Sequence, residues 1–225
     1  SSDVCSSDLE RETAVRLISA QGGLKDNAIP LETVALVAAA DAEGVRRACE
    51  QMDGALKNEY RVTDPKVFVS LSQGKADLLP MDEGSTSRAV CLLTCAPNGI
   101  QAMSADIPGL VQTSLNLGVL TTSQDTLEAS FCVRSSVDSQ KEMLVDRLRC
   151  LAVQLGGTAA VSGDYPGWEY RQDSPLRNLM VEVFTQQYGH APKVEAIHAG
   201  VECGLFAGKL PGLDCVSFGP DLTRS

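Results

Sequence analysis

NLGVLTTSQDTLEASFCVRSSVDSQKEMLVDRLRCLAVQLGG, residues 116–157, predicts two strands followed by a helix. The apolar runs 116–122 and 127–134 flank a polar turn at 123–125, which is typical of a β-hairpin. Ser135 or Ser136 then provides an N-cap, and Gly156-Gly157 ends the helix. Its apolar positions recur every three or four residues, at Leu144, Leu148, Leu151 and Leu155.

The same order of elements occurs earlier in the chain. Residues 13–20 and 32–40 predict a hairpin, and Asp41 predicts the N-cap of a helix with Val45, Ala48, Met52 and Leu56 on its apolar face. Further strands are expected at 66–71, 89–96 and 158–162, with a surface loop at 74–88 and a long loop at 97–109. This pattern predicts an α+β fold, an antiparallel sheet with both helices on one face.

The pattern changes after Asp164-Tyr165-Pro166-Gly167-Trp168. Ser174-Pro175 begins a helix that ends at Gly189 and carries Leu176, Leu179, Met180, Val183 and Phe184. Strands at 193–198 and 214–218 on either side of a helix at 202–207 predict a βαβ unit, and thus part of a parallel α/β sheet.

Composition excludes some classes of function. With 19 basic and 29 acidic residues the net charge is −10, so the chain lacks the basic surface that grips nucleic acid. No run reaches the roughly 18 apolar residues of a membrane span, and no secretory signal begins the chain. We therefore expect a cytoplasmic protein without membrane contact.

The 8 cysteines are scattered and include no C-x-x-C pair, which favours buried, reduced thiols over a disulfide framework. Cys91 and Cys95 are expected to share one face of a strand, which suits packing as well as metal binding. With only 2 histidines, a self-contained Cys/His zinc site is not expected.

Both ends of the chain are unusual. Ser1-Ser2-Asp3 recurs as Ser6-Ser7-Asp8, so we interpret residues 1–10 as a cloning or adapter scar. The last expected strand enters a loop that stops at Ser225. We therefore expect the sequence to be a fragment of a longer protein.

Few residues indicate chemistry on their own. The end of the expected parallel strand at 193–198 carries three polar residues, His198, Glu202 and Cys203, at the place where α/β sheets bind ligands. These residues suit a substrate clamp, a partial metal site or a Cys/His nucleophilic pair. A purely structural role is equally compatible with their spacing. Arg134, at a strand end, suits a substrate carboxylate, although a solvated arginine is the commoner case. Asn116 either donates to a substrate carbonyl or braces its loop. The carboxylates of Asp77, Asp82 and Glu83 are interpreted as a solvated loop face.

Six segments together resemble one family, the aminoacyl-histidine or cytosol nonspecific dipeptidases, which are relatives of carnosinase and peptidase T. The resemblance spans residue 14 to about residue 220 and rests on the segments 27–30, 97–103, 109–118, 134–139, 163–168 and 198–206.

The resemblance implies a di-zinc exopeptidase in which two metal ions activate a bridging water, a Glu acts as general base, and the protein holds the carboxylate of a dipeptide. It implies a lid domain that also forms a homodimer, here residues 11–170, and a late part of the catalytic domain, residues 171–225. Arg134, Asn116, His198 and Glu202 map onto substrate-binding positions. The family's metal ligands and general base fall outside this sequence, so we carry over no metal ligand and no catalytic residue and expect the isolated chain to be inactive.

Two alternatives remain. The first is a non-catalytic dimerisation or small-molecule-binding module on the same α+β sheet. The second is a hydrolase that uses Cys203 and His198, which no oxyanion-hole motif accompanies.

Overall fold

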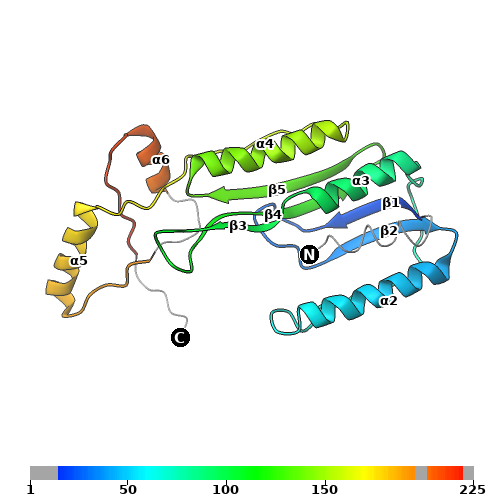
Figure 1. Ribbon diagram of the computed structural model, residues 1–225, viewed down its shortest axis with the longest axis horizontal. Coiled ribbons are helices and arrows are strands. Elements are labelled where there is room, and N and C mark those ends of the chain that lie inside the picture. The colour runs from blue at the N-terminus through cyan, green and yellow to red at the C-terminus, as the bar shows by residue number, and fades with distance from the viewer. Residues whose placement is uncertain (1–14, 196–201, 220–225) are drawn as a thin grey trace. The chain divides into compact units, whose positions relative to one another are not determined.

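The computed structural model describes residues 15–195 and 202–219, which contain five strands and five helices and form an α+β fold (Figure 1). The strands are β1 (Val15–Gly22), β2 (Thr33–Ala39), β3 (Gly99–Met103), β4 (Val111–Thr122) and β5 (Leu127–Ser135). The helices are α2 (Ala42–Glu59), α3 (Glu83–Cys95), α4 (Asp138–Gln154), α5 (Pro175–Tyr188) and α6 (Glu202–Lys209).

The strands form one sheet in the order β2-β1-β4-β3, and β5 also pairs with β4. Both expected hairpins are confirmed. β1 and β2 pair antiparallel from Val15↔Ala39 to Gly22↔Thr33. The β4–β5 turn is closed by a hydrogen bond from the Ser123 amide to the Thr126 carbonyl, 2.9 Å long.

The two helices expected beside the sheet are also confirmed. The Asp41 carboxylate caps α2 by accepting from the amides of Glu43 and Gly44. The predicted face of α2 is buried at Val45, Ala48 and Met52. Helix α4 is followed by Gly156 in the left-handed conformation, at φ +76°.

A third helix replaces the strand expected at 89–96. The prediction that two helices accompany the sheet was therefore wrong in their number. Asp82, expected on a solvated loop face, accepts a 2.8 Å hydrogen bond from the Ser85 amide and begins α3. Ala89 and Leu93, four residues apart, pack against the core that includes Leu17. A largely apolar run of eight residues is too short for its periodicity to distinguish a strand from a helix. The N-cap at Asp82 and the packing of Ala89 and Leu93 on the core favour the helix.

Two other expected strands are absent from the part that the structure describes. Residues 66–71 alternate in exposure, but the Val69 amide bonds to the Asp53 carboxylate of α2 rather than to a strand. Residues 158–162 are exposed and form no ladder. Conversely, β3 lies inside the expected loop 97–109 and pairs antiparallel with β4.

The chain divides into two compact units, and β4, β5 and α4 each have residues in both of them. The first contains residues up to Pro97 with Asn116–Cys132 and Leu148–Ala159. Its core includes Leu17, Ala20, Ala89 and Leu120. The second contains Asn98–Leu115, Val133–Arg147 and the residues from Ala160 onward. Its most buried side chains include Thr113, Leu115 and Leu144, each at most 2% exposed.

The C-terminal helices are confirmed, but the parallel sheet is not observed. Ser174 caps α5 and Gly189 ends it at φ +75°, as expected. Helix α6 covers the expected 202–207. Residues 193–195 and 214–218 form no ladder, and 196–198 lie outside the described residues. A parallel strand needs a neighbour for its hydrogen bonds, and neither segment finds one in the described chain.

The seven cysteines in the described ranges form no disulfide, in line with the expectation that the chain has no disulfide framework. They are half-buried or exposed, however, so the expectation that they are buried was wrong for these seven. Among the described helices none is long and apolar enough to cross a membrane.

Candidate functional site

The structure distributes the candidate residues over both units. Asn116 lies on β4 in the first unit, whereas Arg134 near the end of β5 and Glu202 at the start of α6 belong to the second. Arg134 is half-buried and Glu202 is exposed. His198 lies outside the described residues.

A buried hydroxyl holds the chain just after Arg134. Thr113 of β4 is fully buried, and its Oγ1 lies 2.8 Å from Ser135 Oγ and donates to Gln140 Oε1. Ser135 Oγ in turn accepts a 3.0 Å hydrogen bond from the Val137 amide, immediately before α4. These bonds tie the end of β5 to the first turn of α4 and thereby fix the backbone that carries Arg134.

The segment 163–168 lies against this same turn, at a contact we call the Gly167 junction (Ser136, Asp138, Lys141, Asp164, Pro166, Gly167, Gly204 and Gly208). A Cβ at Gly167 would lie 2.3 Å from the Ser136 carbonyl oxygen, so only glycine fits there. The Gly167 amide donates a 2.7 Å hydrogen bond to the Asp138 carboxylate.

Lys141 supplies the charge at the junction. Its side chain is 16% exposed, and its ammonium lies 2.7 Å from the Asp164 carboxylate and 3.3 Å from that of Asp138. It also donates to the Tyr165 carbonyl. Burial alone would lower the pKa of Lys141, but the bonds to Asp164 and Asp138 outweigh it and raise the pKa, so the ammonium stays charged at neutral pH.

Helix α6 contacts the other side of the segment through two glycines one helical turn apart. A Cβ at Gly204 would lie 2.9 Å from the Pro166 carbonyl oxygen, and one at Gly208 would lie 2.7 Å from the Pro166 ring. The junction therefore sets the position of α6, on which Glu202 is the first residue. Three segments of the resemblance, 134–139, 163–168 and 198–206, meet here through their described residues.

Asn116 takes part in a separate contact, which we call the Asn116 bracket (Gly23, Asp26, Ala28, Asn116 and Gly118). Its Nδ2 donates to the carbonyls of Asp26 and Ala28, at 3.1 and 3.2 Å. A Cβ at Gly118 would lie 2.0 Å from the Asp26 carbonyl oxygen, so this loop lies flat on β4. Both amide hydrogens of Asn116 are thus used in bracing its loop, which leaves Oδ1 as the atom for any further contact.

The described residues do not fit a two-metal centre. Among them, no three His, Cys, Asp or Glu side chains are grouped so as to hold an ion. His190, the histidine that is described, packs its ring against Phe184 and is exposed. That this chain supplies no metal ligand stays a prediction, because His198 lies outside the described residues.

The environment of Cys203 disfavours a thiolate nucleophile. Burial raises the pKa of its thiol, and the nearby Cys215 and Glu202 raise it further. Because the thiolate is the reactive form, a raised pKa disfavours Cys203 as a nucleophile.

Lys141 and the glycine pair 204/208 were not among the residues singled out from the sequence. The spacing of the two glycines, four residues apart on a helix, indicates close approach of another backbone and was available as a signal. The sequence gives no sign that Lys141 pairs with Asp164, because Lys141 lies within α4 and Asp164 lies beyond the end of that helix at Gln154.

Comparison with known proteins agrees with the suspected resemblance. No protein-family model matches the chain. Over 214 residues it is 35% identical to the cytosol non-specific dipeptidase of Escherichia coli strain K12, a match that covers 94% of this chain and 44% of the relative. The crystal structure of aminoacylhistidine dipeptidase from Vibrio alginolyticus matches 97% of this chain and 46% of its own length, with a TM-score of 0.86 and 31% identity. The chain thus spans less than half the length of these two relatives, and over that span both relatives are similar to it and are dipeptidases of the kind that the resemblance named.

Proposed function

We propose that this chain is the lid domain and a late part of the catalytic domain of a metal-dependent dipeptidase, with residues 11–170 as the lid and 171–225 as the catalytic part. The observation that carries the proposal is the TM-score of 0.86 over 97% of the chain to an aminoacylhistidine dipeptidase. The meeting of three family-like segments at the Gly167 junction supports it, because that contact joins the end of the proposed lid to α6.

The substrates are unblocked dipeptides, including those with a C-terminal histidine. Arg134 holds the substrate carboxylate, because a guanidinium can bond both carboxylate oxygens at once. Glu202, His198 and the Oδ1 of Asn116 make further substrate contacts. Thr113 and the junction act on Arg134 and Glu202 only by positioning them.

Two zinc ions would supply the activated water for hydrolysis. This chain holds neither the ions nor the general base in the proposal, so the 225 residues alone do not hydrolyse dipeptides. The complete protein is a cytoplasmic homodimer that assembles through the lid. The free thiols and the word cytosol in the name of the E. coli relative support the location.

The test is to read the coding DNA on both sides of these 225 codons and to assay the protein encoded by the continuous frame. We expect dipeptide hydrolysis that a chelator abolishes and Zn²⁺ restores. Arg134→Ala should raise KM at least tenfold, whereas Arg46→Ala, in an exposed ion pair on α2, should not change it. If the continuous frame encodes a protein without metal-dependent hydrolysis, the proposal fails and a binding or dimerisation module takes its place.

A further inference from the structure

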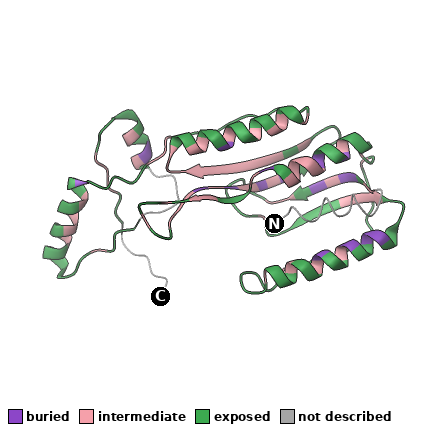
Figure 2. Ribbon diagram, viewed as in Figure 1, coloured by how far each residue is buried: buried purple, intermediate pink, exposed green. Residues whose placement is uncertain are grey.

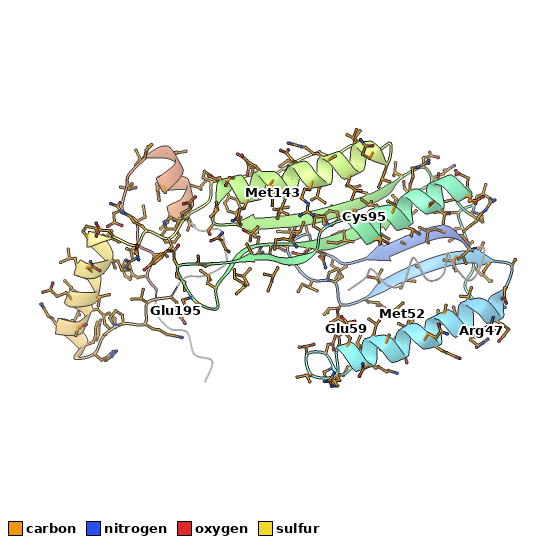
Figure 3. All side chains as sticks on the ribbon, in the orientation of Figure 1. Arg47, Met52, Glu59, Cys95, Met143 and Glu195 are labelled. Carbon is orange, nitrogen blue, oxygen red and sulfur yellow. The ribbon has the colours of Figure 1, made fainter. Side chains whose placement is uncertain are left out.

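Two thiols lie next to each other at the end of α3. Cys91 and Cys95 are four residues apart on this helix, and their Sγ atoms are 3.9 Å apart. Cys95 is exposed and Cys91 is half-buried, so solvent reaches the pair. Figure 3 shows Cys95 at the C-terminal end of the helix.

The helix opposes a disulfide between these two residues. Residues four apart on a helix have Cβ atoms about 5–6 Å apart, whereas a disulfide needs about 3.5–4.5 Å. Closing the bond would therefore distort the last turn of α3. The pair is better suited to remain two thiols that face a common point.

The spacing of the sulfurs fits a metal ion held between them. A zinc–sulfur bond of about 2.3 Å and a tetrahedral angle place two thiolates about 3.8 Å apart. The observed 3.9 Å matches this edge without movement of the helix. Thiolates select soft cations over hard ones such as Mg²⁺ or Ca²⁺.

The end of the helix also favours a cation. Cys95 is the last residue of α3, whose final turn contains no basic side chain. The carbonyl groups at the C-terminal end of a helix carry a partial negative charge, which attracts a positive ion. No basic side chain in the last turn of α3 balances this charge.

We propose that Cys91 and Cys95 chelate one soft, thiophilic divalent cation of the Zn²⁺ and Cd²⁺ type. On binding, two Sγ–metal bonds form, the two thiol protons pass to solvent, and water or small thiols complete the coordination. This proposal does not depend on the proposed dipeptidase activity.

The test is a Cd²⁺ titration of the reduced 225-residue chain, followed by the ultraviolet absorption of the cadmium–thiolate bond and by proton release. A second thiol pair must be removed first, because Cys203 and Cys215 are close enough to interact. We expect the Cys203→Ala/Cys215→Ala protein to bind one Cd²⁺ and to release two protons.

Adding Cys95→Ala to this protein should weaken binding at least tenfold, and Cys150→Ala, at an exposed thiol on α4, should leave it unchanged. Cys95 is exposed, so its loss does not disturb the core, and circular dichroism checks that α3 is retained. Two results would overturn the proposal. One is an unchanged Cd²⁺ affinity after Cys95→Ala, and the other is no cadmium–thiolate absorption in the Cys203→Ala/Cys215→Ala protein.

Discussion

The region 15–155 and the region 174–219 are equally rich in apolar side chains, yet the structure buries them differently (Figure 2). In the first region Leu115 and Leu144 are at most 2% exposed. In the second, α5 buries no residue, and Leu179 and Val183 are 56% and 51% exposed. Apolar patterning alone therefore does not make a core, because a helix face needs another surface to pack against.

Strand formation shows the same contrast. In the first region each hairpin strand pairs with the next strand of the chain, after ten residues between β1 and β2 and four between β4 and β5. In the second, the expected strands 193–198 and 214–218 depended on parallel neighbours, and the described part of the chain provides none. We therefore expect the second region to be less stable than the first.

The largest test of this contrast compares two leucines on helices. Leu144→Ala on α4 removes a side chain with no exposed surface and should lower the free energy of unfolding by about 2–5 kcal/mol. Leu179→Ala on α5 should change it by less than about 0.5 kcal/mol. Urea denaturation followed by circular dichroism measures both, and equal effects would contradict the contrast.

A second comparison uses two glycines of the first region. Gly118→Ala would force a Cβ to within 2.0 Å of the Asp26 carbonyl oxygen, so the Asn116 bracket should open at a cost of about 1–3 kcal/mol. Gly54→Ala, on α2 with nothing within 4 Å, should stabilise the protein by up to about 1 kcal/mol. The same denaturation experiment serves, and a stabilising Gly118→Ala would show that the loop does not lie on β4.

Helix caps sharpen the contrast further. Asp41→Ala removes the carboxylate that accepts from Glu43 and Gly44, and should lower the free energy of unfolding by about 0.5–2 kcal/mol. Ser174→Ala removes the cap of α5 and its bond to Asp214, but it should affect only local opening of that helix. Hydrogen exchange distinguishes the two, and a shift of the whole unfolding transition by Ser174→Ala would be the contrary result.

The smallest expected effect is acid release of α5. Bonds from the Ser174 hydroxyl and the Leu176 amide lower the pKa of Asp214. Its carboxylate therefore stabilises the folded segment above the unfolded pKa of about 3.9, and this contribution is lost as pH falls through the lower folded value.

Exchange of the Leu176 amide should accelerate as the pH is lowered below about 4, relative to its intrinsic rate. Asp214→Asn should make this exchange fast already at neutral pH. Asp125→Asn, in the turn between β4 and β5, serves as the control and should have no effect on this amide. No acceleration in acid would mean that Asp214 does not hold the start of α5.

The elements that were predicted correctly from the sequence are those whose decisive residues lie within or next to the element itself. Asp41, Ser174 and Gly189 act on neighbouring backbone, and hairpin partners lie close in sequence. The errors occurred where distant contacts decide, as for α3, which packs on Leu17, and for 66–71, which bonds to Asp53. The candidate site divides in the same way: Arg134 was recognisable at a strand end, but the ion pair of Lys141 with Asp164 exists only after folding.

Hydrogen–deuterium exchange of the whole chain at neutral pH tests the central claim, that the region 15–155 buries its apolar side chains and is more stable than the region 174–219. We predict slow exchange along β1, β4 and α4, and exchange at least a hundredfold faster along α5 and α6, because few buried apolar contacts oppose their opening. Equal protection of α5 and α4 would contradict the account.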